Sequence, residues 1–113
     1  MLPKKFRATK KEIENTLKNG KIISAGFIYA KVSYRDLKNP TFAIIVPKKT
    51  EKTSVGRHLL KRRVGAVLES IIPSIENFNR TIIFFVQKST TKPDFSEIKK
   101  SVLEILKKSG AIV

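Results

Sequence analysis

The segment FAIIVPKKTEKTSVGRHLLKRR, residues 42–63, joins a strand to a helix through a basic loop. Phe42–Val46 combines aromatic and β-branched residues, which favour a strand. Pro47 stops that strand, because proline cannot donate a hydrogen bond to a neighbouring strand. Lys48–Thr53 follows as a loop in which lysine is the commonest residue. The segment therefore places positive charge where a strand ends and a helix begins.

The helix after this loop is long and leads into another strand. Ser54 is its predicted N-cap, and the helix is expected to run to about Ile72. Pro73 and Ser74 are expected to end it. The next apolar run, Thr81–Val86, reads TIIFFV and carries no polar side chain after its first residue. Such a run is typical of a strand that is buried on both faces, so we expect it at the centre of a sheet.

Two further elements are predicted on the N-terminal side. Thr9 and Glu12 have the spacing of a capping box, so a short helix is expected over about 9–19, followed by Gly20 as its C′ residue. Residues 22–34 are rich in Ile, Val, Phe and Tyr and alternate imperfectly. This composition predicts one strand.

The remaining segments complete a mixed fold. Arg35–Pro40 has the composition of a hairpin loop, and Asp94 with Glu97 has the spacing of a second capping box. A last helix then carries an apolar stripe made of Phe95, Ile98, Val102 and Leu106. The expected order is α-β-β-α-β-α, which predicts a single α+β domain over residues 1–113, with helices packed on a small central sheet.

Charge is the first indication of function. The chain has 113 residues, with 24 Lys and Arg against 9 Asp and Glu, and a formal net charge of +15. Residues 1–63 hold 17 of these basic residues and 4 of the acidic ones, so the excess lies in the N-terminal half. Charge concentrated in this way is typical of a protein that binds a polyanion, most often nucleic acid. No apolar run approaches the roughly 18 residues of a membrane span, and no secretory signal is visible, so we expect a cytoplasmic protein.

The helix after Ser54 concentrates this charge on one side. At about 100° per residue, four cationic side chains fall on an arc of roughly 140°, and Gly65 lies inside that arc. Arginine suits phosphate because its planar group donates two parallel hydrogen bonds. The four residues are Arg57, His58, Lys61 and Arg62, and Lys48 with Lys49 extends the stripe. The side expected to face the sheet holds Val55, Leu59, Leu60, Val64, Val67 and Ile71.

The sequence is poor in catalytic groups. It has no Cys, which excludes disulfides, thiolate zinc sites and cysteine nucleophiles, and it has a single His. No pair among its acidic residues has a spacing that suggests a two-metal nuclease or an acid–base couple. Neither a Gly-rich phosphate loop nor a Gly-x-Ser-x-Gly elbow is present. We therefore expect no catalytic residue and no metal site among its own side chains.

The central segment resembles the protein subunit of bacterial ribonuclease P. That family has a strand ending in Val-Ser-Lys-Lys, a short loop, and a helix carrying Arg-Asn-Arg-x-Lys-Arg. The corresponding residues here are Val46-Pro47-Lys48-Lys49 and Arg57-His58-Leu59-Leu60-Lys61-Arg62. The first helix, the third strand and the last helix also fall where that family has them, so the resemblance covers about residues 4–108. This chain departs from the family pattern at Pro47, His58, Leu59 and Gly65.

The resemblance implies both a fold and an activity. The fold would be that of ribonuclease P proteins, similar to domain 2 of ribosomal protein S5, with a left-handed β-α-β crossover in place of the usual right-handed one. The chain would be the protein component of a ribonucleoprotein endonuclease that removes the 5′ leader from precursor tRNA. The RNA subunit, with Mg²⁺ bound mainly by that RNA, would perform the hydrolysis. Its partners would be the ribonuclease P RNA and precursor tRNA, with no membrane and no obligate protein partner.

Two groups of residues are the predicted sites under this resemblance. Contacts with the RNA subunit are assigned to Lys48, Lys49, Arg57, His58, Lys61 and Arg62. A cleft between the first helix and an open sheet face would hold the single-stranded leader, because aromatic faces stack on any base. The predicted cleft residues are Ile13, Leu17, Phe27, Tyr29 and Lys31.

Other classes of protein remain open at this point. A structural RNA-binding protein of the ribosomal type would share the charge but not the order of the motifs. A membrane-surface protein would share the basic stripe, although the apolar side of the helix is needed for the core. A nuclease that acts without RNA fits the acidic residues least.

Overall fold

The fold is a four-stranded sheet with helices on both faces. The computed structural model describes residues 6–25, 28–33, 40–48, 52–75, 80–86 and 95–109. Along the chain the elements are α1 (Lys10–Asn19), β1 (Lys21–Ala25), β2 (Ile28–Val32), β3 (Thr41–Ile45), α2 (Ser54–Ile75), β4 (Thr81–Val86) and α3 (Phe95–Ser109). The α+β class is confirmed, and the order α-β-β-β-α-β-α contains one strand more than predicted.

The sheet has the order β1-β2-β4-β3. β1, β2 and β4 pair antiparallel, whereas β3 pairs parallel with β4, to which it is joined through α2. All six residues of β4 are buried, which confirms its predicted central position. β3, α2 and β4 form the β-α-β crossover. Its left-handed sense stays a prediction, made from the resemblance to the ribonuclease P protein family. On the outer side of β3, Arg7 bridges to Phe42 in parallel, so the N-terminal segment extends the sheet by one short contact.

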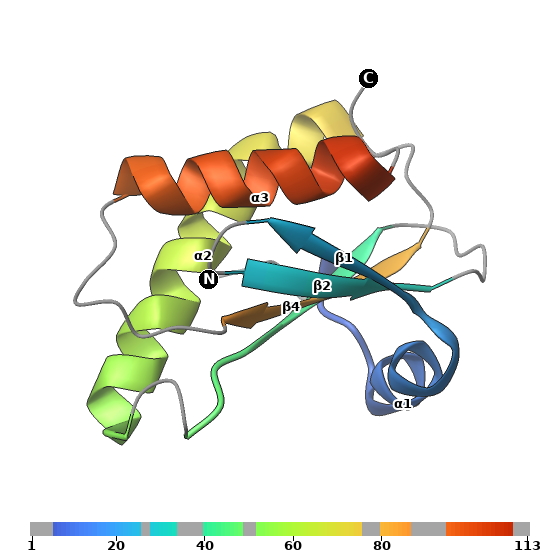
Figure 1. Cartoon of the computed structure of the whole chain (residues 1–113), viewed down its shortest axis with the longest axis horizontal. Coiled ribbons are helices and arrows are strands. Elements are labelled where there is room, and N and C mark those ends of the chain that lie inside the picture. The colour runs from blue at the N-terminus through green and yellow to red at the C-terminus, as the bar shows by residue number, and fades with distance from the viewer. Residues whose placement is uncertain are drawn as a thin grey trace.

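The two faces of the sheet are covered unequally. α2 and α3 lie over one face, and α1 lies on the other (Figure 1). The core under α2 and α3 contains Ile82, Phe84 and Val86, because alternate residues of a strand point to the same face. The predicted stripe of α3 is confirmed by Ile98, Val102 and Leu106, all 0% exposed. α1 packs on the opposite face against β4 and β2.

The single strand predicted over residues 22–34 is wrong. Two strands occupy this stretch, β1 and β2, and their register pairs Ala25 with Ile28. The residues between the two strands lie outside the described part of the chain, and Gly26 is the residue in the sequence that signals a break. The signal was missed because each strand has two β-branched residues among its five, so one continuous strand was read through both.

Both predicted ends of α2 are also wrong. Thr53, not Ser54, is the N-cap, since its Oγ1 accepts a hydrogen bond of 3.0 Å from the Gly56 N–H. At the other end the helix continues through Pro73 to Ile75. Proline removes one N–H, whose partner in a regular helix would be the carbonyl of Glu69. Both residues are exposed, and the last turn persists beyond Pro73.

The predicted start of α1 is confirmed in atomic detail. The Thr9 Oγ1 accepts from the Glu12 N–H at 3.2 Å, and the Glu12 Oε1 accepts from the Thr9 N–H at 2.7 Å, which closes the capping box. Gly20 follows the helix but has φ −74° and ψ 152°, an ordinary extended conformation. The residue is needed for space instead: a Cβ there would lie 2.5 Å from the Thr16 carbonyl oxygen and 3.1 Å from the Val32 carbonyl oxygen.

Two glycine substitutions are therefore expected to have opposite effects on stability. Gly20→Ala forces backbone atoms apart and is expected to lower the free energy of unfolding by about 1 kcal/mol or more. Gly65→Ala places a methyl group 3.8 Å from Ile44 Cδ1, an ordinary contact, and removes a helix-interior glycine, so it is expected to gain about 1 kcal/mol. Urea unfolding of the two variants measures both. A loss of stability in Gly65→Ala would contradict the conclusion that a methyl group fits at this position.

Two predicted features lie outside the described residues, namely the cap at Asp94 and, apart from Pro40, the loop Arg35–Pro40. The Phe95 side chain of the α3 stripe is likewise not described. Among the helices that the structure describes, none is both long enough and apolar enough to cross a membrane.

Candidate RNA interface

A groove with a cationic rim runs beside α2. It lies between the N-terminal segment, β3 and the first half of α2, and its volume is about 370 Å³. The residues that line it are Arg7, Ala8, Phe42, Ala43, Ile44, His58, Lys61, Arg62 and Gly65. The structure thus brings three of the residues predicted to contact RNA, His58, Lys61 and Arg62, to one place. No hydrogen bond or ion pair ties these three side chains to another residue within the described ranges.

Arg57 does not belong to this groove. Its Nη1 donates a 3.0 Å hydrogen bond to the Lys52 carbonyl oxygen, and its backbone N–H donates to the Thr53 carbonyl oxygen. Arg57 therefore holds the loop against the first turn of α2. The helical projection gave the angle of Arg57 on α2. A projection of one helix cannot show a contact with the loop that precedes that helix.

The apolar side of α2 is narrower than predicted. Leu60 and Val64 are buried against the sheet as expected, with Val67 and Ile71. Val55 is 79% exposed and Leu59 is 40% exposed, so neither belongs to the core. Leu59 is the direct neighbour of the buried Leu60, so its exposure comes from its angle around the helix. At about 100° per residue, Val55 and Leu59 lie roughly 80° or more from the buried stripe, and the predicted apolar side was drawn too wide.

The other predicted contacts with the RNA subunit come from the loop before α2. Lys48 is exposed in the turn that follows β3. Lys49 lies outside the described residues.

The second predicted site is on the sheet face that carries α1. Tyr29 and Lys31 of β2 point to this face, opposite to the buried Ile28, Ala30 and Val32. α1 covers one end of the face, where Ser33 and Thr81 lie beside it. Tyr29 is four residues from Ser33, a distance of about 13 Å along a strand. The face around Tyr29 is therefore only half-buried.

Tyr29 forms a stacked pair with Phe85. The two residues are directly paired between β2 and β4, their ring centroids are 4.6 Å apart, and their planes differ by 6°. Because neighbouring strands are about 4.8 Å apart, this geometry places the rings face to face across the strands. The second face of Tyr29 is then directed toward β1, where Ser24 is its paired residue. Ser24 is small and exposed, so it leaves space beside the ring.

Sequence reasoning missed Phe85 and Ser24 as cleft residues. Phe85 belongs to a run that reads as buried on both faces, and only the pairing with Tyr29 shows that it supports the ring. Ser24 carries no signal of its own in the sequence. Strand register could have found both, but the error over residues 22–34 left that register undefined.

Lys31, whose contact with the leader stays a prediction, also makes a contact within the protein. Its Nζ donates a 3.0 Å hydrogen bond to the Leu17 carbonyl oxygen, in the last turn of α1. The contact ties α1 to β2 and places a cation at a helix C-terminus, where it is favourable. Leu17 is 39% exposed and Ile13 is half-buried, so both remain at the edge of the open face. Phe27 lies outside the described residues.

Replacing Lys31 is accordingly expected to affect the position of α1 more than the electrostatics of binding. Lys31→Met should lower the free energy of unfolding by about 1 kcal/mol, the value of one hydrogen bond. Lys21→Met, an exposed lysine of β1, serves as the control and should change stability by less than about 0.5 kcal/mol. Equal stability of the two variants by urea unfolding would argue against the tie to Leu17.

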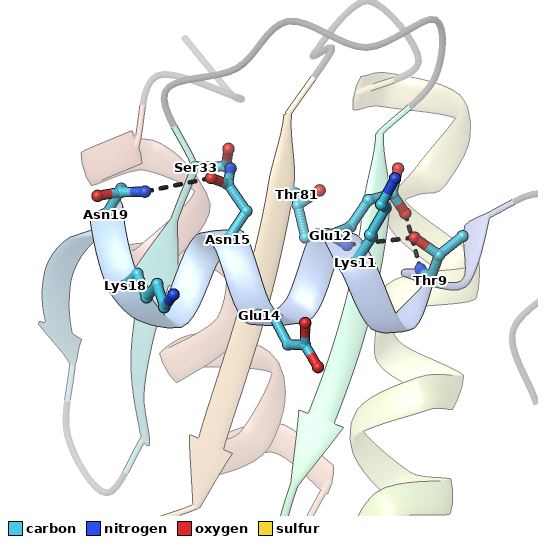
Figure 2. Close-up of a pocket in the computed structure, with 9 residues that line it drawn as sticks. All are labelled: Thr9, Lys11, Glu12, Glu14, Asn15, Lys18, Asn19, Ser33 and Thr81. Atoms are coloured by element: carbon cyan, nitrogen blue, oxygen red, sulfur yellow. Dashed lines mark hydrogen bonds between the residues drawn. The ribbon is translucent and has the colours of Figure 1, made fainter.

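A second depression runs along α1, where the helix meets the ends of β2 and β4 (Figure 2). Thr9, Lys11, Glu12, Glu14, Asn15, Lys18 and Asn19 line it from the helix, and Ser33 and Thr81 from the strands. The Asn19 Nδ2 donates to the Asn15 Oδ1 at 3.2 Å, and the capping box occupies the other end. Acidic and basic side chains alternate here, so the depression does not have the uniform positive charge that a phosphate backbone requires.

Carboxylates and histidine do not gather elsewhere. Among the residues that the structure describes, no three His, Asp or Glu side chains come close enough to hold a metal ion.

Comparisons with known proteins agree with this architecture. The sequence matches the model of the Ribonuclease P family over residues 2–110. No curated protein sequence matches it. The fold is similar to that of Staphylococcus aureus RNase P protein in a mutant with defective mRNA degradation activity, with a TM-score of 0.81, 18% identity, and coverage of 95% of this chain and 90% of that one. A structure of the S. aureus protein at 2.0 Å gives a TM-score of 0.77 and 17% identity, with 96% and 98% covered. A third structure, also of the S. aureus RNase P protein, gives a TM-score of 0.78 and 18% identity, and the match covers 99% of this chain and 95% of that one.

The family match spans nearly the whole chain, and the solved structures share its fold over nearly the same length. Proteins of this family are components of ribonuclease P, the ribonuclease that processes tRNA. The chain therefore belongs to the ribonuclease P protein family, as its resemblance to that family predicted.

Proposed function

We propose that this protein binds the ribonuclease P RNA through α2 and the single-stranded 5′ leader of precursor tRNA through the open sheet face. The observation that carries the proposal is the cationic rim of one groove. His58, Lys61 and Arg62 stand exposed on one side of α2, with Arg7 across the groove. Basic side chains gathered on one surface can neutralise the phosphates of an RNA backbone.

The leader is assigned to the face that carries Tyr29. One face of the Tyr29 ring is covered by Phe85, and the other is directed to the space above Ser24. A base inserted there continues the aromatic stack and makes no sequence-specific contact. Stacking of this kind tolerates every base, which suits leaders of different sequence. Ile13 and Leu17 of α1 form the far edge of the same cleft.

Hydrolysis is assigned to the RNA subunit and to Mg²⁺ bound mainly by that RNA. The family resemblance implies that the RNA subunit is the catalyst. The role of this chain is to bind RNA. Its side chains raise the affinity for substrate by neutralising phosphate and stacking on bases. No residue of the chain is proposed as a nucleophile, a general base or a metal ligand.

Cleavage of precursor tRNA at low Mg²⁺ tests the proposal. A bacterial ribonuclease P RNA is assayed with and without this protein, and the 5′ end of the product is mapped. The expected result is maturation at the correct site that requires both components. Cleavage by the protein alone would show that it is itself the nuclease. Tight RNA binding without stimulation would instead favour a structural RNA-binding protein of the ribosomal type.

A further inference from the structure

The groove beside α2 is lined by apolar residues as well as by basic side chains. The apolar part of the lining comes from Ala8, Phe42, Ala43, Ile44 and Gly65. A surface that binds only phosphates needs no apolar lining. The combination of a small apolar slot and surrounding cations is the composition of a nucleotide site, in which a base enters the slot and phosphates remain outside.

The edge of β3 adds hydrogen-bonding groups to this slot. β3 is the last strand of the described sheet, and among the described residues its outer edge is bridged only at Phe42, by Arg7. The Ala8 N–H donates a 2.9 Å bond to the Phe42 carbonyl oxygen, which shows that the Phe42 backbone groups point away from β4. The N–H and C=O of Ile44, two residues further, point to the same side. They offer one donor and one acceptor to a ligand in the groove, and every base has an edge with both.

Gly65 leaves the groove open, although no neighbouring atom requires a glycine at this position. A Cβ at this position would meet a single heavy atom within 4 Å, the Ile44 Cδ1 at 3.8 Å. Alanine could therefore stand here without a clash, and glycine costs about 1 kcal/mol of helix stability compared with alanine. What glycine provides is the absence of a side chain between α2 and β3, on the side of the helix that also carries His58 and Lys61.

We propose that this groove binds one unpaired nucleotide of RNA, with its base against Ile44 and Gly65 and its phosphates on Arg7, Lys61 and Arg62. The proposal rests on the proposed function, because it specifies how the α2 surface recognises its RNA. It adds that α2 selects a position where a base is unstacked, and does not only follow a continuous duplex. A strand edge also attracts extended peptides, but three cationic side chains in the lining, Arg7, Lys61 and Arg62, favour an anionic nucleotide.

Binding of AMP and of ribose 5-phosphate tests the proposal directly. The two probes carry the same phosphate and ribose and differ in the base. Each is titrated into the protein at low salt while the amide NMR signals of Ile44 and Gly65 are followed. We expect AMP to bind about tenfold or more tightly than ribose 5-phosphate, because the base adds apolar burial against Ile44 and hydrogen bonds to the backbone groups of Ile44. Both amide signals should shift with AMP.

Variants at Gly65 show whether the slot is the site. Gly65→Leu fills the slot and is expected to abolish the preference for AMP, while ribose 5-phosphate still binds. Ala66→Leu adds the same side chain one residue later, at an exposed position, and should keep the preference. Circular dichroism and urea unfolding of both variants separate loss of the slot from loss of the fold.

Equal affinity for the two probes in the unmodified protein would overturn the proposal and leave a plain anion site. Ile44 and Gly65 shifts that respond to an acidic extended hexapeptide but not to AMP would overturn it in favour of a peptide-binding edge. Either result leaves the cleavage assay unaffected. Conversely, a protein that fails to stimulate cleavage but keeps its preference for AMP would refute the proposed function and not the nucleotide site.

Discussion

Tyr29→Leu is expected to weaken the binding of precursor tRNA to the ribonuclease P holoenzyme by about 1–3 kcal/mol, or roughly 5- to 150-fold. The Tyr29 ring is stacked on Phe85 at 4.6 Å, and its second face is the one proposed to hold a leader base. Leucine still covers Phe85 with an apolar side chain but offers no aromatic face. The loss should therefore come from stacking and not from exposure of the strand beneath it.

The measurement compares precursor tRNA with mature tRNA. Because mature tRNA has no leader, its affinity should be the same for Tyr29→Leu and the unmodified protein. Tyr29→Phe keeps the aromatic face and should bind precursor normally. Ser24→Leu leaves the stacked pair intact but fills the space beside it, so it should lose affinity for precursor only. An equal loss for precursor and mature tRNA would place Tyr29 outside the leader site.

The core of this fold could be predicted from sequence because the apolar residues of each core segment follow one regular pattern. β4 is apolar at every position after Thr81, and the α3 stripe repeats every three to four residues. Ile98, Val102 and Leu106 are fully buried as a result. The stretch from Lys21 to Val32 could not be predicted in the same way. Its two strands are equally rich in β-branched residues, and the break between them is visible only as one glycine.

The sites were predictable to a lesser degree. The helical projection of α2 collected His58, Lys61 and Arg62, because residues three and four apart lie on one side of a helix. It gave no information about Arg7 or Ile44, which the tertiary fold brings to the same groove from other elements. The roles of Arg57 and Lys31 were also out of reach. Each donates a hydrogen bond to a backbone carbonyl, and a sequence does not show which carbonyls a fold leaves without partners.

The double variant Lys61→Ala/Arg62→Ala is expected to have the largest effect on binding of the RNA subunit. Both side chains are exposed on the rim of the groove, and a hydrogen bond to a charged group contributes about 1.5–3 kcal/mol. Loss of two such contacts should lower the affinity by roughly 100-fold or more. The dependence on salt should fall as well. Each phosphate contact contributes about 0.7–0.9 to the slope of log affinity against log salt, so the slope should decrease by about 1.4–1.8.

Lys99→Ala/Lys100→Ala is the matched control, because it removes the same charge from exposed positions of another helix, α3. If affinity depended only on net charge, the two double variants would lose the same amount, and the α2 surface would have no special role. If the α2 cations contact phosphates directly, only the Lys61/Arg62 variant loses the salt slope. Long-range attraction is screened within about 8 Å at physiological salt, whereas a direct contact releases counterions at any salt concentration. The slope therefore distinguishes contact from attraction even where the affinities of the two variants are close.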